Sequence, residues 1–209
     1  MCTLLMAIEQ HAEYPWVIAA NRDEYRDRPT APMDWWPEHP NLLAGRDLRA
    51  GGTWMGMTRS GRFAAVTNFR EPRCVYPRGP SRGALVHDFL TGTASPRAYG
   101  LTLAREGRRY DGFNLVMGDT RSGLYYCGNR GANRDDRNRH GRHPVDVAPL
   151  PPGIYGLSNH CLDTPWPKVT QGKALLAESL SAADDCLETR LLETLADTAQ
   201  PADADLPDT

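Results

Sequence analysis

Two short apolar runs at the start of the chain place the strongest constraint on its fold. Residues 2–8 are almost entirely apolar, and residues 16–20 form a second such run after a turn that ends in Pro15. Runs of this length are typical of strands buried on both faces, and two of them joined by a short turn predict a hairpin. Because a hairpin returns the end of its second strand to the start of its first, Arg22 and Asp23 are expected beside Cys2.

Cys2 directly follows the initiator Met1, which aminopeptidases remove when the next side chain is small. The mature chain would then begin with a thiol next to a free α-amino group. Such a pair is one recognised way to supply a nucleophile with its own base. From position alone, a cysteine at residue 2 without any special role remains the alternative interpretation.

Composition limits the functional classes. The chain has 209 residues and a net charge of −2, which favours one domain, expected over residues 1–199, and gives no field that attracts nucleic acid or anionic membranes. No apolar run approaches the roughly 20 residues that span a bilayer, and the N-terminus lacks the basic start of a signal peptide. The acidic segment 200–209 is expected to be a disordered tail.

The cysteines indicate a reducing environment. There are five, an odd number, and no two have the spacing of a CxxC pair. This pattern argues against a disulfide framework and against a structural zinc site. We therefore expect a cytoplasmic protein with no bound metal, and the chain gives no indication of its oligomeric state.

The remaining segments predict an α+β domain of antiparallel sheets covered by helices. Residues 26–48 are rich in proline and are interpreted as a long loop, a type of segment that often binds ligands. Residues 129–152 are interpreted as a polar excursion. Further strands are predicted at 53–58, 63–68, 113–118, 123–127 and 154–158, and helices at 81–90, 96–105, 166–180 and 186–195.

An ordered set of short motifs resembles one family, the NRDE-motif family, also called the transport and Golgi organisation protein 2 family. Each motif is weak alone, but together they run through most of the chain: MC at 1–2, AANRDE at 19–24, GGTWMG at 51–56, AVTN at 65–68, SRG at 81–83, GFNL at 112–115, GNRG at 128–131, YGLSN at 155–159 and PWPK at 165–168.

The resemblance implies a four-layer αββα sandwich of the N-terminal-nucleophile hydrolase type. Cysteine members of that class, such as bile salt hydrolases and penicillin acylases, use an N-terminal Cys, a nearby Arg and Asp, and two Asn. By resemblance, Cys2 matches the nucleophile, Arg22 the residue that favours its thiolate, and Asp23 the residue that orients the amine. Asn68 and Asn159 match the amide donors to the oxyanion.

The same residues have simpler interpretations. The charges after residue 21 could close the hairpin as a solvated cluster, and Asn68 and Asn159 could be turn residues, since Asn is common after a strand. Trp35 and Trp36, with Trp54 nearby, could line a ligand groove or pack in the core. His140 and His143 lie among arginines in a loop, where a solvated segment is favoured over a metal site or a nucleic-acid arm.

Family members usually continue beyond the region that matches residues 206–208, with strands that include a Tyr-Gly-Thr-Arg-like motif. The chain is therefore expected to lack the family's C-terminal strands and to leave one sheet edge unpaired.

Two functions are compatible with the resemblance. In the first, the protein handles a small hydrophobic metabolite, in haem trafficking or in lipid and acyl-CoA homeostasis. Haem is then a transported ligand and no resident cofactor is expected. In the alternative, the protein is a cysteine amidohydrolase that cleaves linear amide C–N bonds through Cys2.

Overall fold

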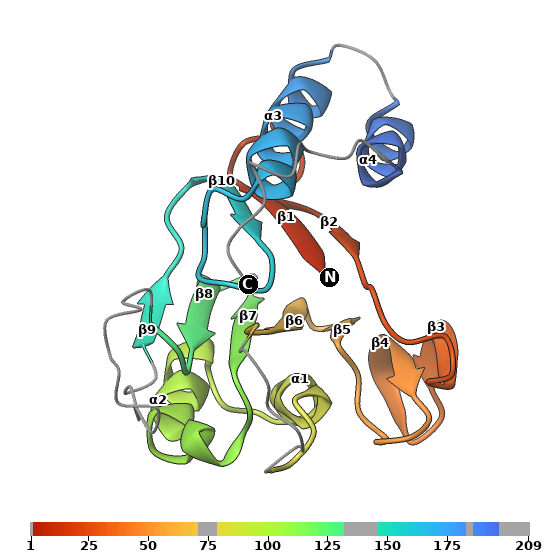
Figure 1. The fold of residues 1–209 in the computed structure, drawn as a ribbon, viewed down its shortest axis with the longest axis vertical. Helices are drawn as coiled ribbons and strands as arrows, with labels where there is room; N and C mark the ends of the chain where they lie inside the picture. The colour runs from red at the N-terminus through yellow and green to blue at the C-terminus, as the bar shows by residue number, and fades with distance from the viewer. Residues whose placement is uncertain (1, 71–78, 132–145, 183–185, 197–209) are drawn as a thin grey trace. The chain divides into compact units, whose positions relative to one another are not determined.

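The computed structural model describes residues 2–70, 79–131, 146–182 and 186–196. Within these residues the fold is α+β, with two antiparallel sheets and four α-helices (Figure 1). The elements are β1 Thr3–Ile8, β2 Trp16–Asn21, β3 Thr30–Trp36, β4 His39–Asp47, β5 Met55–Thr58, β6 Arg62–Asn68, α1 Gly83–Thr91, α2 Pro96–Glu106, the short 3-10 helix η1 Gly107–Arg109, β7 Phe113–Asp119, β8 Gly123–Gly128, β9 Asp146–Pro149, β10 Gly153–Leu157, α3 Pro167–Ser181 and α4 Leu187–Leu195.

The chain divides into two compact units. The terminal unit joins both ends of the sequence, Met1–Asp23 and Pro151–Thr209, and the central unit is Glu24–Leu150. The terminal unit holds a three-stranded sheet in the order β10-β1-β2 with α3 and α4, and the central unit holds a seven-stranded sheet that runs from β3 to β9 in sequence order with α1 and α2.

Strand β1 is the middle strand of the terminal unit's sheet. It pairs antiparallel with β2 on one side and with β10 on the other, so that Leu4 lies opposite both Ala20 and Leu157. Leu5 packs with Leu176 of α3 in the core of this unit. A side chain at Gly172 would meet Leu5 at 2.8 Å, so the glycine lets α3 approach the strand closely. Leu4 alternates to the other face and is also buried, which confirms a strand buried on both faces.

The apolar stripe of helix α4 packs against the core of the terminal unit, and a side-chain hydrogen bond from Asn21 holds the end of the helix. Leu187 and Leu191 pack against the core that contains Leu176. Asn21 Nδ2, at the end of β2, donates to the carbonyl oxygen of Leu195 at 2.6 Å. The last carbonyls of a helix have no partner within the helix, so Asn21 satisfies one of them.

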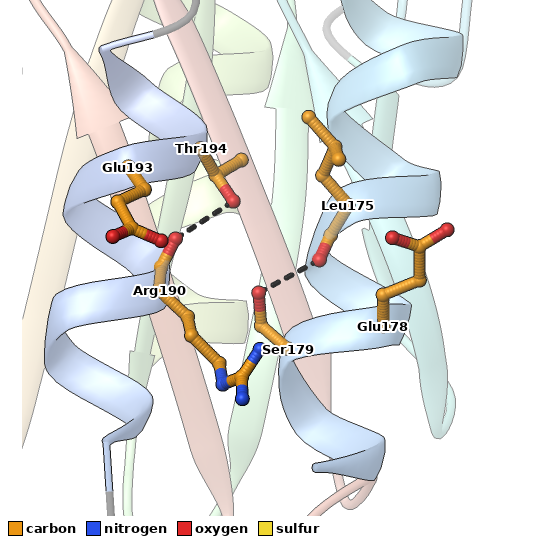
Figure 2. A pocket seen from close by; sticks show the side chains of 6 residues that line it. All are labelled: Leu175, Glu178, Ser179, Arg190, Glu193 and Thr194. Atoms are coloured by element: carbon orange, nitrogen blue, oxygen red, sulfur yellow. Dashed lines mark hydrogen bonds between the residues drawn. The ribbon is translucent and has the colours of Figure 1, made fainter.

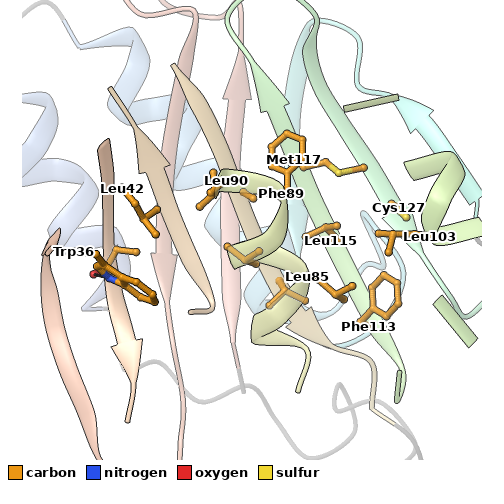
Figure 3. Packing of buried hydrophobic residues seen from close by; sticks show 14 residues of the cluster. Trp36, Leu42, Leu85, Phe89, Leu90, Leu103, Phe113, Leu115, Met117 and Cys127 are labelled. Carbon is orange, nitrogen blue, oxygen red and sulfur yellow. Dashed lines mark hydrogen bonds between the residues drawn. The ribbon is translucent and has the colours of Figure 1, made fainter. Parts of the chain in front are cut away.

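The core of the central unit lies between its sheet and helices α1 and α2 (Figure 3). Alternate residues of β7, Phe113 and Leu115 among them, face the helices, where Phe89 of α1 and Leu103 of α2 are buried with them. The start of α2 is as the sequence predicts. Ser95 Oγ accepts a hydrogen bond from the backbone N–H of Ala98 at 3.2 Å, and proline occupies the first turn.

The interpretation of residues 26–48 as a loop is wrong, because this segment forms the β3–β4 hairpin. The prolines that suggested a loop are accommodated where the ladder is irregular. The register of the pair shifts between Ala31 and Asp34, around Pro32, and Pro37 lies in the turn between the strands. Strand β3 is an edge strand of the sheet, and edge strands tolerate proline because one row of their N–H groups has no ladder partner.

The segment 129–152, which was predicted to be a polar excursion, contains one more strand. This four-residue strand, β9, pairs with β8. Because β9 is short and lies among polar residues, its sequence shows no alternation of apolar and polar side chains. Residues 132–145, which include His140 and His143, lie outside the described residues, as does the predicted tail 200–209.

Candidate active site

The strand registers align three of the predicted site residues at one end of β1. Thr3 pairs with Asn21 on β2, and Leu4 pairs with Leu157 on β10. Continued by one residue along β2 and by two residues along β10, these registers bring Arg22 and Asn159 to either side of Cys2. The predicted hairpin accounts for the first neighbour, and the pairing of β1 with β10 supplies the second.

Cys2 is nearly buried, with 8% of its surface exposed. Its carbonyl oxygen accepts two side-chain hydrogen bonds, from Ser158 Oγ at 2.8 Å and from Lys168 Nζ at 3.1 Å. The Ser158 hydroxyl also lies 3.2 Å from Asn159 Oδ1. Cys2 and Asn159 are therefore linked through one buried hydroxyl group.

The segment after β10 is folded back onto the strand that precedes it. Asp163 Oδ1 accepts from the N–H of Gly156 at 2.9 Å, and the Asp163 N–H donates to the Gly156 carbonyl at 2.9 Å. Asp163 has a φ of 56°, a left-handed conformation that Asp adopts more readily than most residues. The turn fixes the direction in which Ser158 and Asn159 leave the strand.

Arg22 and Asp23 follow β2 directly. Arg22 is half-buried and Asp23 is exposed. The neighbouring Asn21 serves a structural purpose, because its amide holds the end of α4. Asn21, the first residue of the NRDE motif, thus stabilises the fold. Arg22 and Asp23 follow it at the end of the sheet where Cys2 lies.

Asn68 ends β6 in the central unit, where it is paired in register with Phe113. A polar network lies next to it: Asn114 Nδ2 donates to Thr67 Oγ1 at 3.2 Å, and the Tyr126 hydroxyl donates to Asn114 Oδ1 at 2.7 Å. Thr67 and Asn114 are almost fully buried. The end of β6 is therefore held by side chains as well as by the ladder.

The three tryptophans proposed as ligand contacts differ in their surroundings. Trp36 is 4% exposed, packs in the core of the central unit and donates from Nε1 to the Ala44 carbonyl at 3.0 Å. Trp54 is partly buried against the same core. Trp35 is 37% exposed, and the guanidinium of Arg59 lies 3.6 Å from the centre of its ring. For Trp36 the packing alternative applies, and Trp35 presents an aromatic surface to solvent.

Two hollows occur away from these residues. One, of about 260 Å³, lies between α3 and α4 and is shown in Figure 2, with Glu178 and Glu193 on opposite helices and Arg190 at its side. The other, of about 290 Å³, lies in the central unit beside β4, β5 and the end of α1. Neither is lined by a site residue predicted from the sequence.

In the described part of the chain, no three His, Cys, Asp or Glu side chains gather into a group that could hold a metal ion. The same part contains no helix that is both long and apolar enough to span a bilayer.

The sequence profile of the family described as Transport and Golgi organisation 2 matches residues 1–209. The chain belongs to this family. It is 37% identical over 202 residues to the mouse Transport and Golgi organization 2 homolog, and 36% identical to the human homolog. Each alignment covers 93% of this chain and 68% of the relative. The family predicted from the motifs is thus confirmed.

The fold also resembles a solved structure of a distant protein, the Caenorhabditis elegans ortholog of N-acylethanolamine-hydrolyzing acid amidase. The two share 12% sequence identity with a TM-score of 0.56, over 94% of this chain and 86% of the other. The two antiparallel sheets and the helices confirm the predicted α+β fold class, and this likeness agrees with it.

Sequence reasoning assigned no function to Ser158 or Lys168, although both lie in motifs that carried the resemblance. Ser158 immediately precedes the predicted amide donor Asn159 at a strand end, which is a weak signal. Lys168 lies in the first turn of α3, and nothing in its sequence surroundings indicates that its partner is the backbone of Cys2.

Proposed function

We propose that the protein is a cysteine amidohydrolase that cleaves linear amide C–N bonds, with Cys2 as its N-terminal nucleophile. The observation that supports this proposal is the register of β1 with β2 and β10, which, continued past its last pairs, brings Arg22 and Asn159 to either side of Cys2. The acid amidase with a similar fold is a hydrolase of N-acylethanolamines by its name, and this makes N-acyl amides the first substrate class to test.

The proposed reaction begins after removal of Met1. The α-amine of Cys2 takes the thiol proton, and Sγ attacks the carbonyl carbon of the amide. The C–N bond then breaks, and the leaving amine takes the proton from the α-ammonium group, which leaves a thioester on Sγ. Water, deprotonated by the same amine, attacks the thioester and releases a carboxylic acid and the free thiol.

The neighbouring residues have distinct proposed roles. A nearby cation favours the thiolate form of a cysteine, which is the role proposed for Arg22. Asp23 orients the α-amine. Asn159 donates its amide to the oxyanion that forms on attack, and loss of one such donor typically lowers kcat by roughly 10²–10³-fold. Asn68 stays a predicted second donor, on the strength of the family resemblance.

The test is turnover of N-acyl aminomethylcoumarins with acyl chains of increasing length, together with intact mass to detect an acyl adduct. We expect turnover and an adduct in the parent chain, none in C2A, and a loss of roughly 10²-fold or more in N159A. The matched control is C186S, because Cys186 is exposed on the N-terminal side of α4. Full turnover in C2A, or no adduct with any acyl chain, would contradict the proposal.

A second candidate function, the handling of a small hydrophobic metabolite such as haem or an acyl-CoA, is supported by the exposed ring of Trp35. Titration of either ligand while following tryptophan fluorescence tests it, with W35A compared with the parent chain. A saturable change that W35A abolishes would support this function, and an unchanged affinity in W35A would remove its structural basis. A cytoplasmic location stays a prediction from the cysteine content.

A further inference from the structure

Two side chains hold the backbone carbonyl of Cys2. Its two donors are the hydroxyl of Ser158 at 2.8 Å and the ammonium of Lys168 at 3.1 Å. Ser158 follows β10 and Lys168 lies in the first turn of α3, so two different elements converge on one oxygen atom. Ser158 is 3% exposed and Lys168 is half-buried.

The second donor, Lys168, is of a residue type that is rare in this chain. The chain contains only two lysines, and both lie on α3, while arginine supplies every other basic side chain except histidine. An ammonium is a compact point charge with rotatable donors, whereas a guanidinium is a wide planar fork. A compact cation is the better fit to one carbonyl oxygen that already accepts a hydroxyl.

A nucleophile at the N-terminus needs hydrogen bonds of this kind because no peptide group precedes it in the chain. Inside a strand, the peptide groups before and after a residue both fix its orientation. Once Met1 is removed, the orientation of Cys2 depends on the single peptide plane that follows it. A misplacement of about 1 Å in a reacting group can cost roughly 10²-fold in rate.

We propose that Ser158 and Lys168 are positioning residues for Cys2. By holding its carbonyl oxygen, they fix the peptide plane after the cysteine, and with it the directions of the thiol and of the α-amino group. The inference rests on the proposed function, since it concerns the orientation of the same nucleophile. Neither residue is proposed to touch the substrate.

The two lysines provide a matched pair of variants. K168M keeps most of the aliphatic stem and removes the donor on Cys2. K173M makes the same change five residues later on the same helix, where the ammonium instead bonds Asp163 Oδ1 at 2.7 Å. The Asp163 turn keeps its two bonds to the Gly156 backbone in K173M. S158A removes the other donor without adding bulk.

The first measurement is the rate of iodoacetamide alkylation of Cys2 at pH 7, followed by peptide mapping, with exposed Cys186 as the internal reference. We expect a decrease of about tenfold in K168M, since a hydrogen bond from a charged group contributes roughly that factor or more, and a decrease of about fivefold in S158A, whose hydrogen bond joins two neutral groups. The Cys186 rate should not change. K168R, which restores a cationic donor but with a wider head, should recover only part of the Cys2 rate, and K173M should match the parent chain.

The second measurement is the split between kcat and KM for an N-acyl aminomethylcoumarin. Loss of positioning should lower kcat about tenfold at unchanged KM, whereas general unfolding would lower the amount of active protein and open Cys127, which is buried in the folded chain, to alkylation. Cys2 rates and kcat values equal to the parent's in both K168M and S158A would overturn the inference and leave the proposed function standing. A parent chain whose Cys2 is unreactive and turns over no amide would overturn the proposed function.

Discussion

The guanidinium of Arg28 holds the carboxylate of Asp47 through two nitrogens, with Nη2 at 2.6 Å and Nε at 3.1 Å from the same oxygen, Oδ2. The other oxygen, Oδ1, accepts from the backbone N–H groups of Arg49 and Ala50 at 3.0 and 3.2 Å. One carboxylate therefore closes the base of the β3–β4 hairpin and also forms the turn that follows β4.

This arrangement predicts a loss of stability in acid. Burial raises the pKa of Asp47, but the Arg28 guanidinium and the two N–H groups outweigh it and hold the pKa below its usual value. A depressed folded pKa contributes stability that is present above the unfolded pKa, about 3.9, and is lost as the pH falls through the folded value. D47N should lower the free energy of unfolding by about 1–2 kcal/mol at pH 7 and by much less at pH 2–3.

Urea denaturation at both pH values measures this difference. The control is D27N, which removes an exposed carboxylate of the same unit and should change stability by less than about 0.5 kcal/mol. A D47N effect of equal size at both pH values would show that the charge of Asp47 does not stabilise the hairpin.

The cysteines should differ in their rates of alkylation. Burial raises the pKa of the Cys161 thiol and so lowers its thiolate fraction at pH 7, whereas Cys186 is exposed to the reagent. Cys127 is fully buried in the core of the central unit. Among these three, we expect Cys186 to label first, Cys161 about tenfold more slowly or worse, and Cys127 only in denaturant. Equal rates for Cys161 and Cys186 under native conditions would contradict the order.

Processing of the N-terminus should control the reactivity of Cys2. Intact mass of protein from cells should show that Met1 is absent, and Cys2 should then label faster than Cys186. A variant with a glutamate inserted before Cys2 retains its Met and has no free amine beside the thiol, so it should lose amide turnover. Turnover at the parent rate in that variant would show that the α-amine is not the base.

Asn129 should be a structural residue, although it lies in one of the family's motifs. Its Oδ1 accepts from the N–H of Phe113 at 2.8 Å, and its Nδ2 donates to the carbonyls of Gly107 and Tyr110 at 3.0 and 3.2 Å. N129A leaves these buried groups without partners and should cost about 2–4 kcal/mol of unfolding free energy. N129D keeps an acceptor but loses the donors, so it should not restore stability; urea titration distinguishes the outcomes.

Phe89 should contribute more to stability than any exposed apolar residue of the same unit. Its side chain is fully buried, with the Arg62 guanidinium 4.0 Å from its ring centre and the Tyr99 ring at 5.4 Å. F89A should lower the free energy of unfolding by about 3–5 kcal/mol. L101A, at an exposed position of α2, should change it by less than about 0.5 kcal/mol. Equal losses of unfolding free energy in F89A and L101A would show that Phe89 does not contribute to the core as the structure indicates.

Local patterns were sufficient for most of the fold. The apolar run before Ile8 and the serine–proline pair at residues 95–96 each predict the element that the structure contains. The β3–β4 hairpin was missed because both strands carry prolines and β3 lies mostly exposed at the sheet edge, so the sequence shows no clear strand periodicity there. Strand β9 was too short to show a period.

The site was predictable to a different degree for each residue. The proximity of Arg22 to Cys2 follows from a hairpin of adjacent segments. The position of Asn159 depends on the pairing of β1 with β10, and no local pattern specifies which distant strand pairs with which. The hydrogen bonds that Ser158 and Lys168 donate to the Cys2 carbonyl depend on tertiary geometry that residue type alone does not encode.

The central position of β1 has a consequence for synthesis of the chain. Its hairpin with β2 can form early, but its other edge waits for β10, which emerges roughly 150 residues later and closes a contact of long sequence separation. At about 5–20 residues per second, the apolar strand behind Cys2 stays open on that edge for roughly 8 to 30 s after it leaves the ribosome. During that interval the nascent chain offers a bare strand edge to chaperones and to other copies of itself, and Asn159 has yet to be synthesised.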